Sequence, residues 1–486
     1  MSYVRYTLFY PDSRTLTLAG FGKVAHVPCV FDEKWRYARE SSWYLRDRSK
    51  GLVDTSFNWS IEHLSNPRES LQYAAISGSR LLGFGRAGKP PTDASLETIG
   101  RRHVNFLEWC EWSRKHVLKG RIHAGEAAWT EVTYDDLIQA YGAQMLDGTW
   151  GSHSLAASTV NSRIDEACFF LNWAYAHSLR GAFFVDVHIS RRPDRDAVNR
   201  HVSKNLVSRT QRVRSKPIDL RIPQPNEVDR WLRCVEIEKG FTKGLMCRLM
   251  KATGIRREEC AQWRIGTLPE RRDDWRISIC ERYVTVTLAH GAKGEKYRDE
   301  YGDLVGPSRL ISMPIEIAEE IHRYREFMRP RSRAIYVKNA RSREERQRRM
   351  SEPERRLFLS EYTGMPISSK VLYKAWTEVS YKPIDEWHPQ LMRHYWAVTT
   401  LWEERLKAIS FLKNRNDKVI VTGDWITGTA QSDIQTIICP QLGHVNSKTT
   451  RAYLVWLRQM HDASDQHDAW MSHIGGGDQC VEENTL

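Results

Sequence analysis

Residues 252–259 read Ala252-Thr253-Gly254-Ile255-Arg256-Arg257-Glu258-Glu259. Gly254 predicts the end of one helix, because glycine adopts the left-handed backbone of a helix end at little cost, and Arg256 then stands near the start of the next helix. An arginine held at a helix start, with Glu259 one turn further on to orient it, forms a fixed fork of donors for a phosphate. This spacing of arginine and glutamate is also common on protein surfaces, so the segment alone does not define a site.

A second candidate group is Lys293, in the turn Ala289-His290-Gly291-Ala292-Lys293-Gly294-Glu295-Lys296. Strand patterns are predicted over residues 275–280, 284–288 and 309–313, so this turn lies between strands. A lysine on a flexible hairpin tip can reach across a cleft and deliver a proton. Taken alone, a lysine at such a tip commonly serves only solubility.

A third pattern is His388-Pro389-Gln390-Leu391-Met392-Arg393-His394. Pro389 suits the first turn of a helix, since its missing N–H would have no partner there. Gln390 and Arg393 are three residues apart and are therefore expected on one face of that helix. His388 precedes the helix, and the spacing does not show where its side chain points.

A fourth pattern joins Leu442-Gly443-His444 to Tyr453, which follows nine residues after His444 in a helical stretch over 449–457. A tyrosine on a helix is normally part of the core, and Tyr453 alone would be assigned there. The four patterns together supply arginine, lysine, a second arginine, histidine and tyrosine, in that order, within residues 256–453. Such a series is not expected by chance.

The region 223–460 resembles the catalytic domain of the tyrosine recombinase (phage integrase) family. The residues that match in order and spacing are Thr-Gly-Ile-Arg256-x-x-Glu259, Lys293 between strands, Arg393-His394, and Leu-Gly-His444 with Tyr453. The helical stretch 96–187 is similar to the core-binding domain of that family, whereas residues 1–95 resemble nothing that we can name.

The chain departs from the family pattern at one position that matters. The family usually carries histidine three residues before the second arginine, and Gln390 stands there. His388 lies two residues earlier and could substitute, but Pro389 separates it from the helix. Extra sequence also lies between residues 406 and 442. These departures bear on rate and regulation more than on the type of reaction.

The resemblance implies a mainly α protein with a small antiparallel sheet (α+β), in which a helical core-binding domain precedes the catalytic domain. Five parts of the chain are expected. They are an N-terminal domain of unknown role (1–95), the DNA-binding core-binding domain (96–187), a basic linker (188–220), the catalytic domain (221–460) and a polar C-terminal tail (461–486).

The resemblance also implies phosphoryl transfer on DNA without a metal or another cofactor. Tyr453 would attack a scissile phosphate and form a 3′-phosphotyrosyl link, leaving a free 5′-hydroxyl. Arg256 and Arg393 would clamp the non-bridging oxygens in the transition state. Lys293 would protonate the departing 5′-oxygen, and His444 would add a hydrogen bond to the phosphate.

The remaining roles follow from the same resemblance. Gln390 would stand in for the usual histidine, and Glu259 and His388 are supporting residues. The partner is double-stranded DNA, with four protomers joining two DNA sites and accessory DNA-bending proteins as possible helpers. Such an enzyme is expected to belong to a mobile genetic element.

The charge of the chain agrees with a nucleic-acid partner. The 486 residues include 73 lysines and arginines against 60 acidic residues, a net charge of +13. Residues 191–216 contain nine lysines and arginines and two aspartates, which fits either a solvated linker or a strap along a phosphate backbone. Arg209, Arg212 and Arg214 are the candidate DNA contacts in this segment.

Composition excludes several other classes of protein. The chain is 41% hydrophobic and 27% charged, as in globular domains, and lacks a run of about 18 apolar residues that could cross a membrane. Its first six residues lack the apolar core of a signal peptide. Nine cysteines without a Cys-x-x-Cys pair fit a reducing compartment. The expected location is the cytoplasm, in association with the bacterial nucleoid.

Two alternatives stay open at this stage. A type IB topoisomerase or telomere resolvase shares the same nucleophile and arginine clamp. A DNA-binding regulator with a decayed catalytic site is the other, and Gln390 is the observation that supports it. Covalent capture of target DNA separates the enzymes from the regulator.

Overall fold

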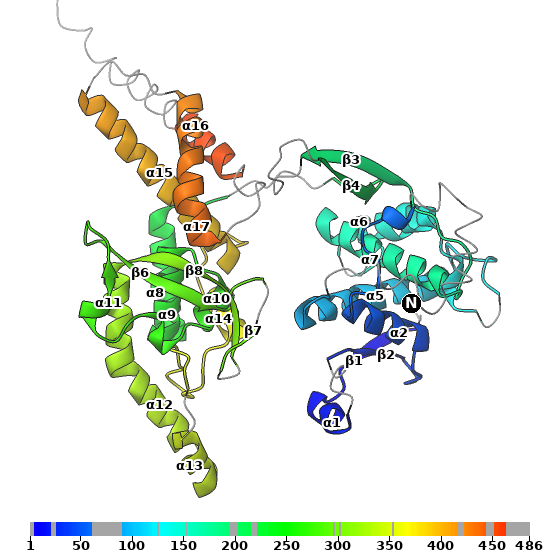
Figure 1. Ribbon diagram of the computed structural model, residues 1–486, viewed down its shortest axis with the longest axis horizontal. Coiled ribbons are helices and arrows are strands. Elements are labelled where there is room, and N and C mark those ends of the chain that lie inside the picture. Colours follow the sequence, from blue (N-terminus) through cyan, green and yellow to red (C-terminus); the bar gives the residue numbers. More distant parts are fainter. Residues whose placement is uncertain are drawn as a thin grey trace, which may run out of the picture. The chain divides into compact units, whose positions relative to one another are not determined.

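The computed structural model describes most of the chain and divides it into two compact units, residues 1–217 and 218–486 (Figure 1). Both units are mainly helical with small antiparallel sheets, which confirms the predicted fold class. None of the described helices is long and apolar enough to span a bilayer. The described residues are 4–20, 26–60, 90–123, 126–151, 153–193, 203–214, 221–294, 297–300, 303–351, 354–415, 422–443 and 452–462.

The first unit contains two long helices, several short ones and two hairpin-like sheets. Its elements are β1 (Tyr6–Phe9), α1 (Ser13–Leu18), β2 (Cys29–Asp32), α2 (Arg39–Ser49), α5 (Asp93–Ser113), the 3-10 turn Ala128–Glu131, the π-helical turn Asp136–Gly142, α6 (Ala143–Asp147), α7 (Ala157–Ala176), β3 (Val187–Pro193) and β4 (Ser203–Arg209).

An aromatic core joins α2, α5 and α7. Tyr44 on α2, Phe106 on α5 and Phe170 on α7 are all buried, and the ring of Phe170 lies 5.2 Å from that of Tyr44 and 6.2 Å from that of Phe106. Residues that the sequence assigned to a separate N-terminal domain therefore share one core with the helical stretch 96–187. α5 begins where Thr92 caps it, with Thr92 Oγ1 accepting from the backbone N–H of Ser95.

This unit contains two antiparallel pairs of strands. β1 is followed by the short helix α1, so its antiparallel partner is β2, with Tyr6 opposite Asp32. The segment predicted as a basic linker forms a second antiparallel pair, β3–β4, with Val187 opposite Arg209. Sequence patterning missed this pair because each strand carries only two or three apolar residues among polar and basic ones.

The second unit begins with a helical pair and a four-stranded sheet, and ends in a group of helices. Its elements are α8 (Pro225–Lys239), α9 (Phe241–Thr253), α10 (Arg257–Ala261), the 3-10 turns Ile265–Thr267 and Arg272–Asp274, β5 (Arg276–Ile277), β6 (Tyr283–His290), β7 (Tyr297–Arg298), β8 (Leu304–Pro314), α11 (Ile315–Arg323), the π-helical turn Tyr324–Met328, α12 (Arg329–Lys338), α13 (Arg343–Ser351), α14 (Ser369–Thr377), α15 (Pro389–Arg415), α16 (Gly423–Asp433), the π-helical turn Ile434–Ile438, α17 (Cys439–Leu442) and the helical residues 452–462.

The sheet has the order β5-β6-β8-β7 and is antiparallel throughout. Val284, Val286 and Leu288 alternate with more exposed residues along β6 and enter the core, as expected for a strand with one covered face. The predicted strands at 284–288 and 309–313 are confirmed within β6 and β8. The strand predicted over 275–280 shrinks to β5.

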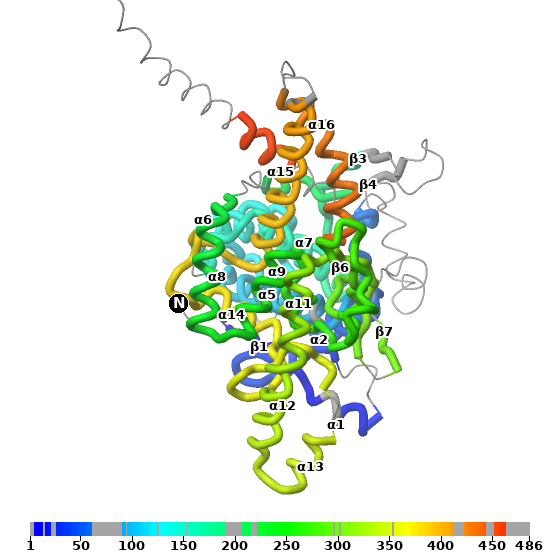
Figure 2. Tube along the Cα trace, turned by 90° about the vertical axis from the view of Figure 1, so that its left-hand side faces the viewer, coloured from blue at the N-terminus to red at the C-terminus, as the bar shows by residue number. Residues whose placement is uncertain are grey.

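Two hydrophobic clusters position the site in this unit. The larger joins α8, α9, the sheet and α14, and includes the buried indoles of Trp231, Trp376 and Trp387. The smaller joins α15, α16, α17 and residues 452–462, and it contains Tyr453. Figure 2 shows α15 and α16 running alongside each other in this region.

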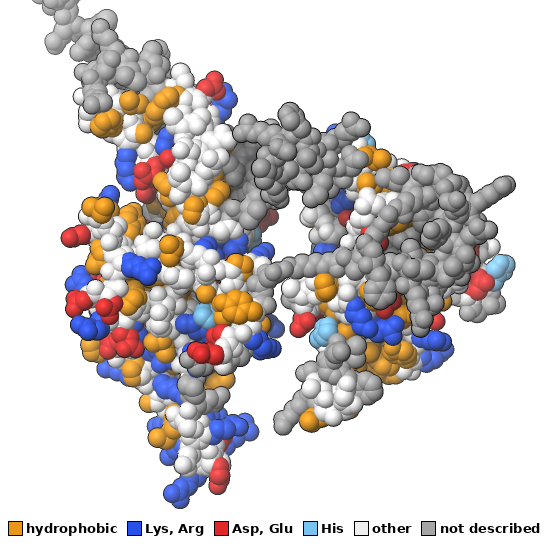
Figure 3. Space-filling view, in the orientation of Figure 1, with side chains coloured by type: hydrophobic (Ala, Val, Ile, Leu, Met, Phe, Trp, Pro, Cys, Tyr) orange, Lys and Arg blue, Asp and Glu red, His pale blue; other side chains and the backbone are white. Residues whose placement is uncertain are grey.

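The surface of the second unit carries many charges of both signs. In the space-filling view, lysine and arginine side chains gather over α12 and α13 at the lower end of the unit (Figure 3). α13 exposes Arg343, Arg346 and Arg348 together with Glu344. Mixed signs of this kind are typical of a solvated helix.

Candidate catalytic site

Gly254 holds together three parts of the second unit. It ends α9 with φ +63°, and a Cβ atom there would lie 2.8 Å from both Leu442 Cδ2 and Trp396 Cε3. Only glycine meets both demands, since other residues rarely adopt this backbone and their Cβ would clash. The predicted helix end is therefore confirmed, and Gly254 lies directly against Trp396 of α15 and Leu442 of α17.

Arg256 and Glu259 form a local ion pair at the start of α10. The backbone N–H of Arg256 donates to Glu259 Oε2 at 2.7 Å, and its Nη1 donates to Oε1 at 3.0 Å. Arg309, from β8, donates to both oxygens of the same carboxylate at 2.7 and 2.8 Å. Burial alone would raise the pKa of Glu259, but the bonds from Arg309 and Arg256 outweigh it and lower that pKa.

Arg393 lies buried on α15, close to these charges. Its Nη1 donates to the carbonyl of Gly254 at 2.7 Å and its Nη2 donates to the carbonyl of Leu442. Its Nε has no hydrogen-bond partner among the described residues. Burial and the charge of Arg256 lower the pKa of Arg393 to about 9, so it remains a cation at neutral pH.

Arg256 and Arg309 pair with the Glu259 carboxylate, and the charge of Arg393 is close enough to interact with all three groups. Three cations against one anion leave an excess of positive charge in a part-buried site. Such an excess is costly unless an anion completes it, because buried charges need partners. The arrangement suits a phosphate, which takes several planar guanidinium donors at once.

Tyr453 brings its hydroxyl to the edge of this cluster. Its Oη lies 2.9 Å from Nδ1 of His394, the residue directly after Arg393, and both rings are largely enclosed. Burial raises the pKa of Tyr453, while the charge of Arg393 opposes that rise. Burial, followed by the charges of Arg393 and His388, lowers the pKa of His394 to about 4, so its imidazole is neutral at pH 7.

Lys293 lies in the loop after β6 and its side chain is exposed. Gly291, two residues earlier, has φ +76°, and a Cβ there would lie 2.6 Å from the carbonyl oxygen of Glu258 and 2.8 Å from Glu259 Cα. The loop thus packs directly on the start of α10. In the described residues no contact joins the Lys293 ammonium to the arginine cluster.

The predicted residues around the second arginine take different positions. His388 caps α15, because its Nδ1 accepts from the backbone N–H of Leu391 at 3.0 Å. This hydrogen bond fixes the orientation of the His388 side chain, which the spacing in the sequence did not show. Gln390 is exposed, and within the described chain no hydrogen bond links it to the buried Arg393. His444 lies outside the described residues.

The three arginines predicted as DNA contacts in the basic segment differ in their burial and their partners. Arg209 is buried in the first unit, where it donates to Asp165 at 2.7 Å and to Asn161 Oδ1 at 2.8 Å. This burial corrects the expectation of a surface residue for Arg209. Arg212 is exposed and pairs with Asp165 at 2.8 Å, and Arg214 is exposed.

Three residues of the site were missed by sequence reasoning. Arg309 and Gln441 lie far from Glu259 along the chain, so no local spacing could reveal their contacts. Gln441 donates from Nε2 to the carbonyls of Thr253 and Ser312, at 3.0 and 2.9 Å, and so fixes α17 between α9 and β8. His394 stood in the third motif, and its adjacency to Arg393 was the one available signal.

One group of side chains among the described residues has the spacing of metal ligands. His290, Asp299 and Asp303 place their ligand atoms within 4.8 Å of one another, in the same hairpin as Lys293. Asp303 also pairs with Arg264 at 3.0 Å, so one of its carboxylate oxygens already has a cationic partner within the chain.

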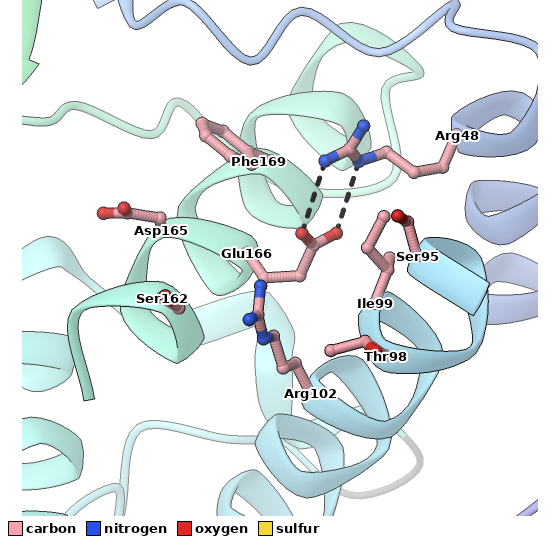
Figure 4. A pocket seen from close by; sticks show the side chains of 9 residues that line it. All are labelled: Arg48, Ser95, Thr98, Ile99, Arg102, Ser162, Asp165, Glu166 and Phe169. Carbon is pink, nitrogen blue, oxygen red and sulfur yellow. Dashed lines mark hydrogen bonds and ion pairs between the residues drawn. The ribbon is translucent and has the colours of Figure 1, made fainter. Parts of the chain in front are cut away.

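A separate pocket of about 420 Å³ opens in the first unit between α2, α5 and α7. Figure 4 shows Arg48 and Glu166 paired at one side, with Arg102 and Ser162 among the other lining residues. Arg48 donates to the two oxygens of Glu166 at 3.4 and 3.5 Å. Arg48 and Glu166, two of the charged residues of the pocket, thus neutralise each other.

The chain is similar to several solved structures, although no protein-family model and no curated protein matches it. A XerH site-specific recombinase bound to difH substrate aligns over 88% of this chain and 93% of its own, with 14% identity and a TM-score of 0.39. The Tn1549 transposon integrase in complex with transposon right end DNA aligns over 79% and 98%, with 14% identity and a TM-score of 0.35. XerA recombinase aligns over 83% and 98%, with 14% identity and a TM-score of 0.28. Because these TM-scores are low, the proposal below rests on the residues of this chain.

Proposed function

We propose that this chain is a site-specific DNA recombinase that cleaves and rejoins DNA through a 3′-phosphotyrosyl intermediate at Tyr453. One observation carries the proposal. The phenol of Tyr453 lies near Arg393, in a site that gathers three arginines, Arg256, Arg309 and Arg393, around one carboxylate, that of Glu259. A nucleophile next to a cluster of cations that can bind an anion is the arrangement that phosphoryl transfer requires.

In this proposal the protein's own cations replace a metal ion. Arg256 and Arg393 hold the non-bridging oxygens of the scissile phosphate and stabilise the charge that gathers there in the transition state. The Nε of Arg393, which has no hydrogen-bond partner among the described residues, supplies a further donor for the phosphate. Glu259 accepts hydrogen bonds from the backbone N–H and the guanidinium of Arg256, and so acts as a positioning residue.

The leaving 5′-oxygen needs a proton, because an alkoxide is a poor leaving group. We assign this role to Lys293, whose loop packs on α10 through Gly291. Its exposed ammonium would approach the phosphate when DNA fills the site. His444 and Gln390 complete the proposed set of groups around the phosphate.

The proposed partner is double-stranded DNA, and the proposed working unit is four protomers on two DNA sites, with accessory DNA-bending proteins where a site requires them. The net charge of +13 supports a polyanionic partner. Transfer of the 3′-phosphate to a 5′-hydroxyl of the second duplex would then complete strand exchange. A mobile genetic element is the expected source of such an enzyme.

The test is covalent capture on nicked target DNA, found among the sequences that flank the gene. The full chain should give a protein–DNA band that survives denaturation, both with and without EDTA. Tyr453→Phe should bind the same DNA and give no such band, because it lacks only the hydroxyl. An adduct in Tyr453→Phe, or a strict metal requirement for cleavage, would remove the proposal.

A DNA-binding regulator with an inactive site is the second candidate. The exposure of Gln390 and the burial of Tyr453 favour it, since a phosphate needs access to the hydroxyl for the covalent step. Tight and specific binding without any covalent band, on a site proven by footprinting, would establish this second function.

A further inference from the structure

The hydroxyl of Tyr453 has a defined neighbour that the proposed catalytic set does not use. His394 Nδ1 lies 2.9 Å from Tyr453 Oη, and the two rings meet at 63° with centroids 5.6 Å apart. Arg393 precedes His394 on α15, so the phosphate clamp and this imidazole are carried by adjacent residues. The imidazole thus touches the atom that would attack.

A phenol needs a proton acceptor to become a nucleophile near neutral pH, because its ordinary pKa is about 10. Gln390 cannot accept the proton, because an amide does not titrate in this range. Lys293 is assigned here to protonate the leaving oxygen, so it does not serve as the acceptor of the phenolic proton. Of the groups on α15 that the structure describes near Tyr453, His394 alone combines contact with the hydroxyl and a neutral basic nitrogen.

We propose that His394 is the general base of this chain, accepting the phenolic proton of Tyr453 as the phosphotyrosyl bond forms. The inference rests on the proposed function and adds a catalytic residue to it. Where the sequence lacks the usual histidine at position 390, an imidazole one turn further along the same helix contacts the nucleophile instead.

The surrounding charges explain how the base would become effective only on DNA. Burial lowers the pKa of His394, and the charges of Arg393 and His388 lower it further. A phosphate bound by Arg393 would neutralise part of that charge and raise the basicity of the imidazole. Burial raises the pKa of the Tyr453 phenol and the charge of Arg393 opposes that rise, so the phenol keeps its proton until a base accepts it.

The proposed step balances without any co-reactant. The bond from Tyr453 Oη to phosphorus forms as the bond from phosphorus to the 5′-oxygen breaks. The phenolic proton moves to Nδ1 of His394, and a proton from Lys293 Nζ moves to the departing oxygen. Rejoining reverses both transfers, so His394 and Lys293 return to their starting states.

The experiment compares two substrates in single-turnover cleavage. One is the ordinary suicide duplex, and the other carries sulfur in place of the bridging 5′-oxygen at the scissile position. A thiolate leaves without protonation, because a thiol has a much lower pKa than an alcohol. Lys293→Ala should therefore be slow on the oxygen substrate and recover on the sulfur substrate.

His394→Asn should behave differently. Asparagine can still hydrogen-bond the phenol but cannot take its proton, so cleavage of both substrates should fall by roughly 10²–10⁴-fold. His394→Ala should be equally slow, and imidazole added to the buffer should restore part of its rate. Melting temperature and DNA affinity are measured for each variant, so a folding defect is recognised directly.

Two results would overturn the assignment. Wild-type rates for His394→Asn would show that the histidine only positions the tyrosine. Recovery of His394→Asn on the sulfur substrate would move its role to the leaving group. If His394→Asn does not fold, the response of His394→Ala to imidazole decides. A failure of imidazole to restore any activity would then overturn the proposal. Failure of the proposed function itself is distinct, since wild type would then cleave neither substrate.

Discussion

Arg309 holds both oxygens of the Glu259 carboxylate, with Nη1 donating to Oε1 at 2.7 Å and Nη2 to Oε2 at 2.8 Å. The pair joins β8 to α10, and the Glu259 side chain is fully buried. Because Glu259 also receives the backbone N–H of Arg256, the sheet is tied to the residue that would clamp the phosphate.

Glu259→Gln should therefore destabilise the second unit. The substitution leaves Arg309 and Arg256 without their charged partner, and breaking a buried pair in this way costs about 3–5 kcal/mol. Urea unfolding measures the change. The matched control is Glu258→Gln, the exposed neighbour, which should change the unfolding free energy by less than about 0.5 kcal/mol. Equal effects at both positions would contradict the pairing.

The same pair predicts how stability depends on pH. The pKa of Glu259 is lowered in the folded protein, so its contribution is present above the ordinary carboxyl pKa of about 4.3 and is lost as pH falls through the folded value. The difference in unfolding free energy between wild type and Glu259→Gln should thus be full at pH 7 and shrink below about pH 4. A difference that stays constant across this range would be incompatible with an ionised Glu259.

Arg256→Lys tests the clamp apart from the fold. Lysine keeps the charge but loses the planar fork, so cleavage should slow by roughly 10²–10³-fold while DNA affinity changes little. Arg257→Lys is the control one residue away, since that guanidinium faces Ser369 Oγ at 2.8 Å and the ring of Tyr373. Single-turnover cleavage should separate the two variants, and similar rates for both would count against a phosphate contact at Arg256.

How far the sequence predicted this site depends on the range of each contact. The turn at Gly254 and the pair of Arg256 with Glu259 are local, so spacing was enough to predict them. Arg309 meets Glu259 across the fold, 50 positions further along the chain, and a charged residue on a strand gave no signal of that partner. The contact of His394 with Tyr453 depends on how two helices pack, which no motif spacing encodes.

His388 offers a prediction about stability rather than chemistry. Its Nδ1 accepts from the N–H of Leu391, so His388→Ala removes a helix cap and should cost about 0.5–2 kcal/mol. His388→Asp supplies a capping oxygen and should restore most of the loss. Thermal melting measures both. A silent His388→Ala would mean that the cap is not formed in solution.

Gln390 should respond in the opposite way. Its side chain is exposed, so Gln390→Leu should leave the melting temperature unchanged. If its amide donates to the phosphate as proposed, the same change should slow single-turnover cleavage by roughly ten- to a thousandfold. Gln390→His should be tolerated. Full activity of Gln390→Leu would remove Gln390 from the proposed set.

Substitutions of the three arginines that the sequence grouped together should differ in their effects on stability and on DNA binding. Arg209 is buried against Asp165 and Asn161, so Arg209→Met should destabilise the first unit, by about 3–5 kcal/mol, and leave the salt dependence of DNA binding unchanged. Arg214 is exposed, so Arg214→Gln should leave stability unchanged and reduce the log–log salt slope by about 0.9, as expected for one lost phosphate contact.

Arg212→Gln should have effects on stability and on the salt slope that lie between those of the other two variants, because Arg212 is exposed and yet pairs with Asp165. Binding to target DNA is measured over a series of salt concentrations, and urea unfolding is measured for each variant. A flatter slope in Arg209→Met with unchanged stability would mean that the buried guanidinium turns outward on DNA. A lost phosphate contact reduces the number of counterions released on binding and so flattens the salt slope. An unchanged slope in both Arg212→Gln and Arg214→Gln would therefore mean that the exposed end of the basic segment is solvated and does not contact phosphate.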